Sequence, residues 1–343
     1  MTDDFTALPD LASRLLGSSV VSATDELFAD RENLIRPEPP VFVADDYGNK
    51  GKTYDGWETR RRRDTGHDAA IVRLGAAGIV RGVVVDTSYF TGNYPPFISV
   101  EATSIEDYPS AEELAAASWD TLVARTPAAG DAVNRYAVTS DRRWTHVRLS
   151  IYPDGGVARF RVHGEVVPDP RFLEGTVDLV ALENGGSVVD CSDMFYSSPV
   201  NLILPGRARS TADGWENARR RDQGHDYVTF QLAAAGWPRY LEVDTSYFIG
   251  NAPGGVQVSG TNASGNWVEL RPRTRVQPDT RHRFRVAAAE PVTHVRLDVY
   301  PDGGLSRFRV FGEIDPSGRE RLRHRWWEAL PGSHRALLGA LPD

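Results

Sequence analysis

Short runs in which apolar and polar residues alternate recur along most of the chain. The clearest are Val147–Tyr152 and Val157–Val162, which are separated by Pro-Asp-Gly-Gly, and the same pattern returns between Val295 and Val310. A period of two places successive side chains on opposite faces of a strand, and Pro, Asp and Gly are typical turn residues. The pattern therefore predicts two β-hairpins, in which Val147 and its apolar neighbours lie opposite Phe160 and Val162.

Other apolar runs end in polar turns. Val83–Val85 precede Asp86, and Tyr240–Val243 precede Asp244, so both are predicted to be strands. Many short strands with Gly/Pro turns are typical of an antiparallel sandwich or jelly roll. We therefore predict an all-β fold.

Helical signals are few. Ser110–Ser118 begins with capping-box spacing between Ser110 and Glu113. A second helix is predicted in the C-terminal tail, over Arg319–Leu341, with Trp326 on it. This helix is expected to pack over the sandwich or against a neighbouring subunit.

One 14-residue segment occurs twice. Residues 55–68 read Asp-Gly-Trp-Glu-Thr-Arg-Arg-Arg-Arg-Asp-Thr-Gly-His-Asp, and residues 213–226 repeat 11 of these 14 positions. The shared positions are mostly polar, charged or glycine, and a hydrophobic core alone does not demand them. The repeat therefore indicates both a duplicated fold and a functional site.

The match between the two copies extends over most of the chain, as expected for duplicated domains. The offset between equivalent residues falls from 168 to 158 and then to 148, which indicates two ten-residue insertions in the first copy, near residues 37–52 and between 94 and 144. Insertions of this kind occur in surface loops. We predict a first repeat over residues 1–168, a second over 169–315 and a helical tail over 316–343.

Charge and cysteine content narrow the class of protein. The 343 residues include 39 Lys and Arg against 47 Asp and Glu, a net charge of −8, which argues against a general nucleic-acid binder. Arg60–Arg63 form a basic run, but acidic residues on both sides of it predict local ion pairs. A single cysteine, Cys191, excludes an intrachain disulfide, and no secretory signal or membrane-length apolar run is present. A cytoplasmic protein without a membrane partner is expected.

The repeated histidines are the first candidates for chemistry. His67 recurs as His225, each beside a glutamate and an aspartate of the motif. Histidine near carboxylates can shuttle protons or bind a metal, although a histidine that only satisfies its own surroundings is an equally good interpretation. The metal interpretation is weaker because adjacent His and Asp on a strand point to opposite faces.

Other repeated polar residues have structural alternatives. Asp86 and Asn93 could cap turns, and Trp57 is most simply a core aromatic. Arg159 and Arg161 lie opposite Phe160 on the predicted strand and could bind a carboxylate ligand. Internal ion pairs with acidic neighbours are an equally good interpretation of these arginines.

Together these motifs resemble the allantoicase family of purine degradation. The resemblance rests on the doubled Asp-Gly-Trp-Glu…Arg-Arg-Arg…Gly-His-Asp, on Val-Asp-Thr-x-x-Phe-x-Gly-Asn and on Tyr-Pro-Asp-Gly-Gly…Arg-Phe-Arg-Val-x-Gly-Glu, in order from about residue 10 to 313. The chain departs from the family at Tyr89 and Tyr247, where the family often has histidine. This departure weakens a ligand or base role at both positions.

The resemblance implies two tandem jelly-roll repeats of the galactose-binding-like type and a hydrolase acting on C–N bonds in linear amidines. Its substrate would be allantoate and its products ureidoglycolate and urea. The Trp-rich tail leads us to expect a homo-oligomer. No cofactor is certain, the need for a divalent metal stays open, and Mn²⁺ is a family-level option. The implied acid–base residues are His67, Glu58, Asp86, His225, Glu216 and Asp244. The implied substrate-binding residues are Arg61, Arg62, Asp68, Tyr89, Asn93, Arg159, Arg219, Arg220, Asp226, Tyr247, Asn251 and Arg307.

Two other classes of function fit the same fold. Tandem jelly rolls can bind a sugar or small acid without catalysis, because function lies in sites and not in folds. A purely architectural oligomer subunit is the third hypothesis, and it predicts no thermal shift with allantoate.

Overall fold

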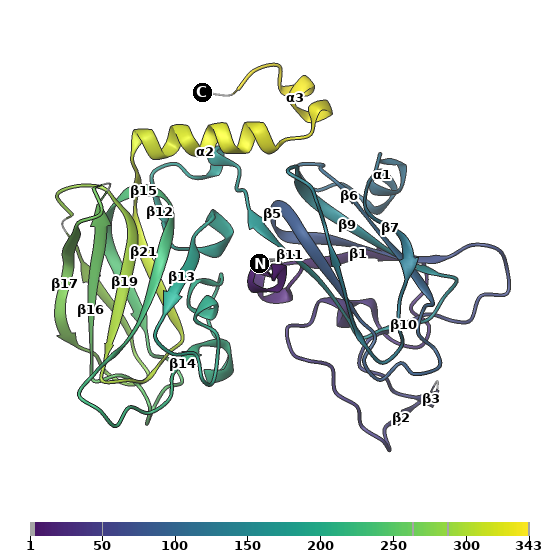
Figure 1. The fold of residues 1–343 in the computed structure, drawn as a ribbon, viewed down its shortest axis with the longest axis horizontal. Helices are drawn as coiled ribbons and strands as arrows, with labels where there is room; N and C mark the ends of the chain where they lie inside the picture. Colours follow the sequence, from purple (N-terminus) through teal and green to yellow (C-terminus); the bar gives the residue numbers. More distant parts are fainter. Residues whose placement is uncertain (1–3, 50, 263, 287, 342–343) are drawn as a thin grey trace. The chain divides into compact units, whose positions relative to one another are not determined.

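A computed structural model describes residues 4–49, 51–262, 264–286 and 288–341 of the chain. It forms two compact units (Figure 1). The first ends at Val167 and also takes in Glu328–Ala340, and the second contains Pro168–Trp327. The tail predicted as one segment is thus divided between the two units.

Each repeat is a sandwich of antiparallel strands. In the first repeat the larger layer runs in the order β1 (Ser19–Ala23), β5 (Asp68–Asp86), β9 (Arg143–Tyr152), β6 (Phe97–Thr103), β7 (Asp120–Pro127). The second layer contains β11 (Arg159–Val166) and β8 (Val133–Ala137), which both pair with β5. The predicted all-β fold of two jelly-roll repeats with a helical tail is confirmed.

The long strand β5 belongs to both layers. Asp68–Arg73 pair with β9, whereas Gly78–Asp86 pair with β11. Small residues fill the bend between these halves, and a Cβ on Gly75 would stand 2.4 Å from the Leu16 carbonyl oxygen. One strand that bends between layers therefore gives the sandwich its continuous core.

This bend corrects the predicted hairpins. β9 pairs with β5 and β6, and β11 pairs with the other half of β5, so the two arms do not pair with each other. Their apolar side chains meet across the sandwich instead: Leu149, Ile151, Phe160 and Val162 are all fully buried. Period-two alternation identified the strands and their inner faces, but it carries no information about which strands pair.

The second repeat has the same architecture. Its larger layer contains β13 (Ser187–Cys191), β15 (Asp226–Asp244), β19 (Val292–Tyr300), β16 (Gly255–Asn262) and β17 (Trp267–Arg275). Three further strands complete it: β12 (Thr176–Asp178), β18 (Arg281–Arg285) and β21 (Arg307–Ile314). β15 bends like β5, pairing first with β19 and then with β21.

Short strands hold the repeated motif in place. β4 (Trp57–Glu58) pairs with β10 (Gly156–Val157), and β14 (Trp215–Glu216) pairs with β20 (Gly304–Leu305). The indole of Trp57 is fully buried and donates a hydrogen bond of 2.8 Å to the Asp25 carbonyl oxygen. The core interpretation of this tryptophan is confirmed.

The two insertions give the first repeat elements that the second repeat does not share. Residues 37–52 carry the small hairpin β2 (Tyr47–Gly48) and β3 (Gly51–Lys52), and the loop between β6 and β7 carries α1 (Ala111–Ala116). α1 has the predicted capping box at Ser110 and Glu113. In the second repeat, β16 ends at Asn262 and β17 begins at Trp267. The connection between these two strands is therefore too short for such a helix.

The tail is two helices and not one. α2 covers Pro316–Ala329 and α3 covers Gly332–Leu338, with Pro331 between them. Proline cannot continue a helix because it lacks the backbone donor. Trp326 is buried within its own chain. In the part of the chain that the structure describes, no helix has the length and apolar character needed to cross a bilayer.

Candidate functional site

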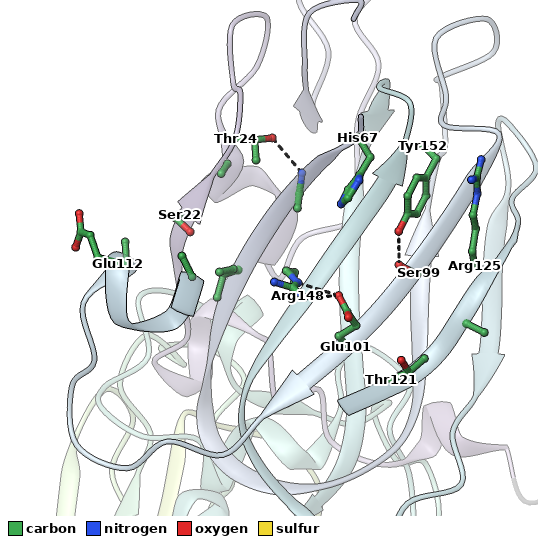
Figure 2. Close-up of a pocket in the computed structure, with 16 residues that line it drawn as sticks. Ser22, Thr24, His67, Ser99, Glu101, Glu112, Thr121, Arg125, Arg148 and Tyr152 are labelled. Atoms are coloured by element: carbon green, nitrogen blue, oxygen red, sulfur yellow. Dashed lines mark hydrogen bonds and ion pairs between the residues drawn. The ribbon is translucent and has the colours of Figure 1, made fainter. Parts of the chain in front are cut away.

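A groove of the first repeat lies on the outer face of the β1–β5–β9–β6–β7 sheet, with α1 along one rim (Figure 2). Its volume is about 990 Å³. Alternation along the strands supplies its polar lining: Arg148 and Tyr152 face the groove from β9, while Leu149 and Ile151 between them face the core. The first repeat's own insertion therefore deepens a polar sheet face into a ligand-sized groove.

His67 and Tyr152 form the upper part of this groove (Figure 2). Their ring centroids are 4.6 Å apart, and the Arg125 guanidinium carbon lies 4.5 Å from the centre of the Tyr152 ring. Tyr152 thus lies between the imidazole and the guanidinium. Burial lowers the pKa of His67 below its usual range, and the positive charges of Arg148 and Arg62 lower it further. His67 is therefore a neutral imidazole at neutral pH, as a general base must be.

Charged partners line the floor. Arg148 binds the carboxylate of Glu101 with a nitrogen–oxygen distance of 2.7 Å, and both side chains are half-buried. The Tyr152 hydroxyl and the Ser99 hydroxyl are 3.0 Å apart. Arg125 has no acidic partner among the described residues, so its charge is available to an anionic ligand.

The second repeat keeps the stacked rings, but its histidine is hydrogen-bonded to an aspartate and its depression is smaller. His225 lies 4.5 Å from Tyr300, and Arg273 lies 4.1 Å from the same ring. However, His225 Nε2 is 2.9 Å from an Asp298 carboxylate oxygen that also binds Arg296. Trp267 lines this smaller depression of about 300 Å³. The imidazole here already has a partner, and α1 has no counterpart.

Glu58 lies elsewhere, in a cleft of about 510 Å³ at the loop end of the first repeat. Its carboxylate accepts a hydrogen bond of 2.6 Å from the Asn93 amide, and burial raises the pKa of Glu58 above its usual value. Arg61 and Arg62 also line this cleft. Glu216 and Asn251 form the same 2.6 Å pair in the second repeat. The structure thus separates the predicted histidine from the predicted glutamate.

Asp68 does not line the groove; it is the first residue of β5, and His67 directly precedes this strand. It lines a third cleft, of about 880 Å³, together with Arg60–Arg63. Arg62 binds its carboxylate at 2.6 Å, and the equivalent Arg220–Asp226 pair has the same distance. The expected local pairing of the basic run is confirmed for Arg62, which also binds Asp64 at 3.2 Å. Arg60 instead binds the distant Asp25 at 2.7 Å.

Four predicted site residues hold loops in place. Asp86 and Asp244 each accept a hydrogen bond of 2.9 Å from a backbone amide two residues on, which is the turn-capping alternative. Tyr89 and Tyr247 have left-handed backbone angles of 70° and 69°, and their amides donate to an aspartate of the facing loop. None of the four lines the groove or the clefts described above.

Arg159 and Arg307 are buried inside their repeats. Arg159 is 2% exposed and binds Asp55 at 2.7 Å as well as three backbone carbonyl oxygens. Arg307 donates to the carbonyl oxygens of Gly206, Asp213 and Ser306, and burial lowers its pKa to about 10. Arg159 is therefore held by an internal ion pair, with Asp55 and not with the predicted acidic neighbours. Arg307 is held by backbone carbonyl oxygens.

Sequence reasoning missed most of the groove. Five of its lining residues were not selected from the sequence: Ser99, Glu101, Arg125, Arg148 and Tyr152. A signal existed for two of them, because Arg148 and Tyr152 share one face of an alternating strand and recur as Arg296 and Tyr300. Ser99, Glu101 and Arg125 lie on strands β6 and β7, whose position beside β9 is not encoded locally.

The donor set does not fit a divalent metal. Within residues 4–49, 51–262, 264–286 and 288–341, no group of three or more His, Cys, Asp or Glu side chains is placed to hold a metal ion. Beside His67, Glu101 is already paired with Arg148, and the carboxylates of the third cleft have arginine partners. Such charge-compensated carboxylates are poor ligands for a hard cation.

Known proteins are similar to this chain in sequence and fold over nearly its whole length. The profile of the allantoicase repeat matches residues 9–167 and 177–315. A probable allantoicase from Nocardia farcinica is 58% identical over 90% of this chain and 95% of its own length, and one from Streptomyces coelicolor is 51% identical over 94% and 90%. The crystal structure of allantoicase from Saccharomyces cerevisiae is similar with a TM-score of 0.77 and 35% identity, covering 89% of this chain and 93% of that chain. The chain belongs to the allantoicase family.

Proposed function

We propose that this protein hydrolyses allantoate to ureidoglycolate and urea, and that the groove of the first repeat is the active site. The observation that supports this most is the groove itself, which gathers a neutral imidazole, an arginine without an acidic partner and a carboxylate–arginine pair in about 990 Å³. Pockets of a few hundred to a thousand Å³ are typical of small-molecule sites.

The groove offers a partner for each group of the substrate. Allantoate carries one carboxylate and two ureido groups on a single sp³ carbon. Arg125 is suited to the carboxylate, because guanidinium and carboxylate form paired charge-assisted hydrogen bonds. Glu101 accepts ureido N–H groups, and the hydroxyls of Tyr152 and Ser99 hydrogen-bond the ureido oxygens.

His67 carries the proton in this proposal. It accepts a proton from water as the water oxygen bonds to the central carbon. The resulting imidazolium gives a proton to the ureido nitrogen whose bond to that carbon breaks. The nitrogen leaves as urea, the carbon keeps the new hydroxyl, and the imidazole returns to its neutral form. Positioned proton transfer of this kind contributes about 10²- to 10⁴-fold to a rate.

Catalysis is assigned to the first repeat alone. His225 is held by Asp298, and Ser259 stands where the first repeat has Glu101. Because Asp298 already occupies the Nε2 atom of His225, this nitrogen is not open to a water molecule or a ligand. The second repeat is therefore proposed to be non-catalytic.

The test measures urea release from allantoate by three proteins: wild type, His67→Asn and the matched control His225→Asn. We expect wild-type turnover, a loss of about 10²- to 10⁴-fold in kcat for His67→Asn, and little change for His225→Asn. Near-normal turnover by a folded His67→Asn variant would contradict the assignment to His67.

The same assay separates the competing functions. A non-enzymatic binding protein would show a thermal shift with allantoate but no urea, and an architectural subunit would show neither. Release of urea by the wild type, followed by its loss in His67→Asn, supports the enzyme.

We also propose a cytoplasmic homo-oligomer. The single cysteine supports a reducing compartment. Exposed apolar side chains on the first insertion, including Val41, Phe42 and Val43, support self-association. Light scattering of the purified chain tests the oligomer, and cell fractionation tests the location.

A further inference from the structure

The same buried carboxylate oxygen lacks a partner in both repeats. Asp68 and Asp226 are each 1% exposed, and in each the Oδ2 atom has no hydrogen-bond partner within the described residues. The other oxygen of each carboxylate is fully used: Asp68 Oδ1 binds Arg62 at 2.6 Å and the Thr24 hydroxyl at 2.7 Å. Because the arrangement recurs in independently placed copies, it is not an accident of one side chain.

A buried carboxylate oxygen without a donor is costly. Leaving such an acceptor unsatisfied costs about 1–3 kcal/mol, and more when it is charged. Buried polar atoms are therefore almost always satisfied by protein, water or a ligand. The atom thus marks a place where a donor from outside the chain is expected.

Asp68 lines the third cleft, of about 880 Å³, and exposed cations line its rim. Arg61 and Arg63 are exposed, and neither forms an ion pair with any described residue. Their neighbours Arg60 and Arg62 are bound to Asp25 and Asp68 and so hold the loop in place. The cleft therefore combines a buried acceptor with two available guanidinium groups.

We propose that this cleft binds a small carboxylic acid that also carries N–H donors, of the α-ureido acid class. Its carboxylate binds Arg61 and Arg63, and its ureido N–H group donates to Asp68 Oδ2. Arginine is the side chain best suited to a carboxylate, and a ureido group offers the donor that Asp68 lacks. The ligand class includes ureidoglycolate, so the cleft is a site at which the product, or a molecule like it, is held.

This cleft is distinct from the catalytic groove. His67 and Asp68 are consecutive, and their side chains line different cavities. Thr24 borders both cavities. The proposal stands on Asp68 and the arginine loop and does not depend on His67 being catalytic.

The experiment uses isothermal titration of the full chain with N-carbamoylglycine, a stable α-ureido acid. The Arg125→Gln variant serves as the parent, so that binding in the groove is weakened. We expect the parent to bind this probe, and Arg61→Gln with Arg63→Gln to weaken binding at least tenfold. Glycolate, which lacks the ureido group, and urea, which lacks the carboxylate, should each bind at least tenfold more weakly than the probe.

Arg142→Ala is the control, because it removes an exposed arginine of the first repeat that does not line the cleft. Binding should persist in this variant. Equal loss in Arg142→Ala would show that only the overall charge attracts the acid, and no heat with the parent would show that water satisfies Asp68. Either result overturns the proposal. Turnover of allantoate by the wild type is measured separately, so failure here is distinguishable from failure of the proposed activity.

Discussion

The imidazole of His67 lies on the phenol ring of Tyr152 with their centroids 4.6 Å apart, and this pair recurs as His225 on Tyr300 at 4.5 Å. The two pairs differ in what surrounds them. His225 has an acidic partner in Asp298, whereas His67 faces an open groove bordered by α1. Both repeats thus keep the stacked rings. In our proposal, the different surroundings of the two histidines make the first repeat catalytic and the second non-catalytic.

Replacing Arg125 with glutamine should raise the KM for allantoate. A hydrogen bond to a charged group contributes about 1.5–3 kcal/mol, which corresponds to roughly a 10- to 100-fold change. Steady-state kinetics measure the effect, and Arg273→Gln in the second repeat is the matched control with an expected KM near that of the wild type. An unchanged KM in Arg125→Gln would assign the substrate carboxylate to another cation.

The acid limb of the pH profile should lie below the ordinary histidine range. Activity requires neutral His67, and burial together with Arg148 and Arg62 lowers the pKa of this group. As the pH falls through that lowered pKa, His67 gains a proton and kcat/KM declines. Arg148→Gln removes a nearby positive charge, so its acid limb should move to higher pH. A limb that stays at the wild-type position in Arg148→Gln would argue that a different group titrates.

Acid should destabilise the fold through His146. This residue is 1% exposed, and burial together with the charge of Arg73 lowers its pKa to about 4. Between the unfolded value of about 6.5 and about 4, only the unfolded chain gains the proton, so stability falls as the pH falls through this window. The difference is worth about 3 kcal/mol at 1.4 kcal/mol for each pKa unit.

Urea unfolding at pH 7 and pH 4.5 tests this dependence. The uncharged variant His146→Gln should show a smaller loss of unfolding free energy between the two pH values than the wild type. Equal losses in both proteins would show that other groups dominate acid unfolding.

Arg159→Met should destabilise the first repeat by about 3 kcal/mol, because it removes the nearest cation from the largely buried Asp55 carboxylate. Arg159 is 2% exposed and binds Asp55 at 2.7 Å, and without it Asp55 keeps only Arg36 at 3.4 Å and the Val41 amide. The control is Arg60→Ala, which removes an exposed guanidinium from Asp25 but leaves Asp25 its bonds from the Leu27 and Arg60 amides, and should cost about 1 kcal/mol. Thermal unfolding compares the two. A stable Arg159→Met protein that has lost affinity for allantoate would restore the carboxylate-binding role predicted from the sequence.

The repeat, the strands and their inner faces can be read directly from the amino-acid pattern. Alternation identified Leu149, Ile151, Phe160 and Val162 as core residues, and the capping box located α1, because these signals depend on neighbours within a few positions of the chain. The doubled motif identified residues that matter in both copies. It could not divide them into sites, since consecutive residues such as His67 and Asp68 line different cavities.

Which residues meet depends on the tertiary structure. β9 and β11 pair with different halves of the bent strand β5, so the predicted hairpin is instead a connection between the two layers. The order of strands then brings Glu101 to Arg148 and Arg125 to Tyr152, and the insertion between β6 and β7 places α1 at the rim of the groove. Strand pairing depends on contacts between segments far apart in the sequence, and local patterns carry no record of such contacts.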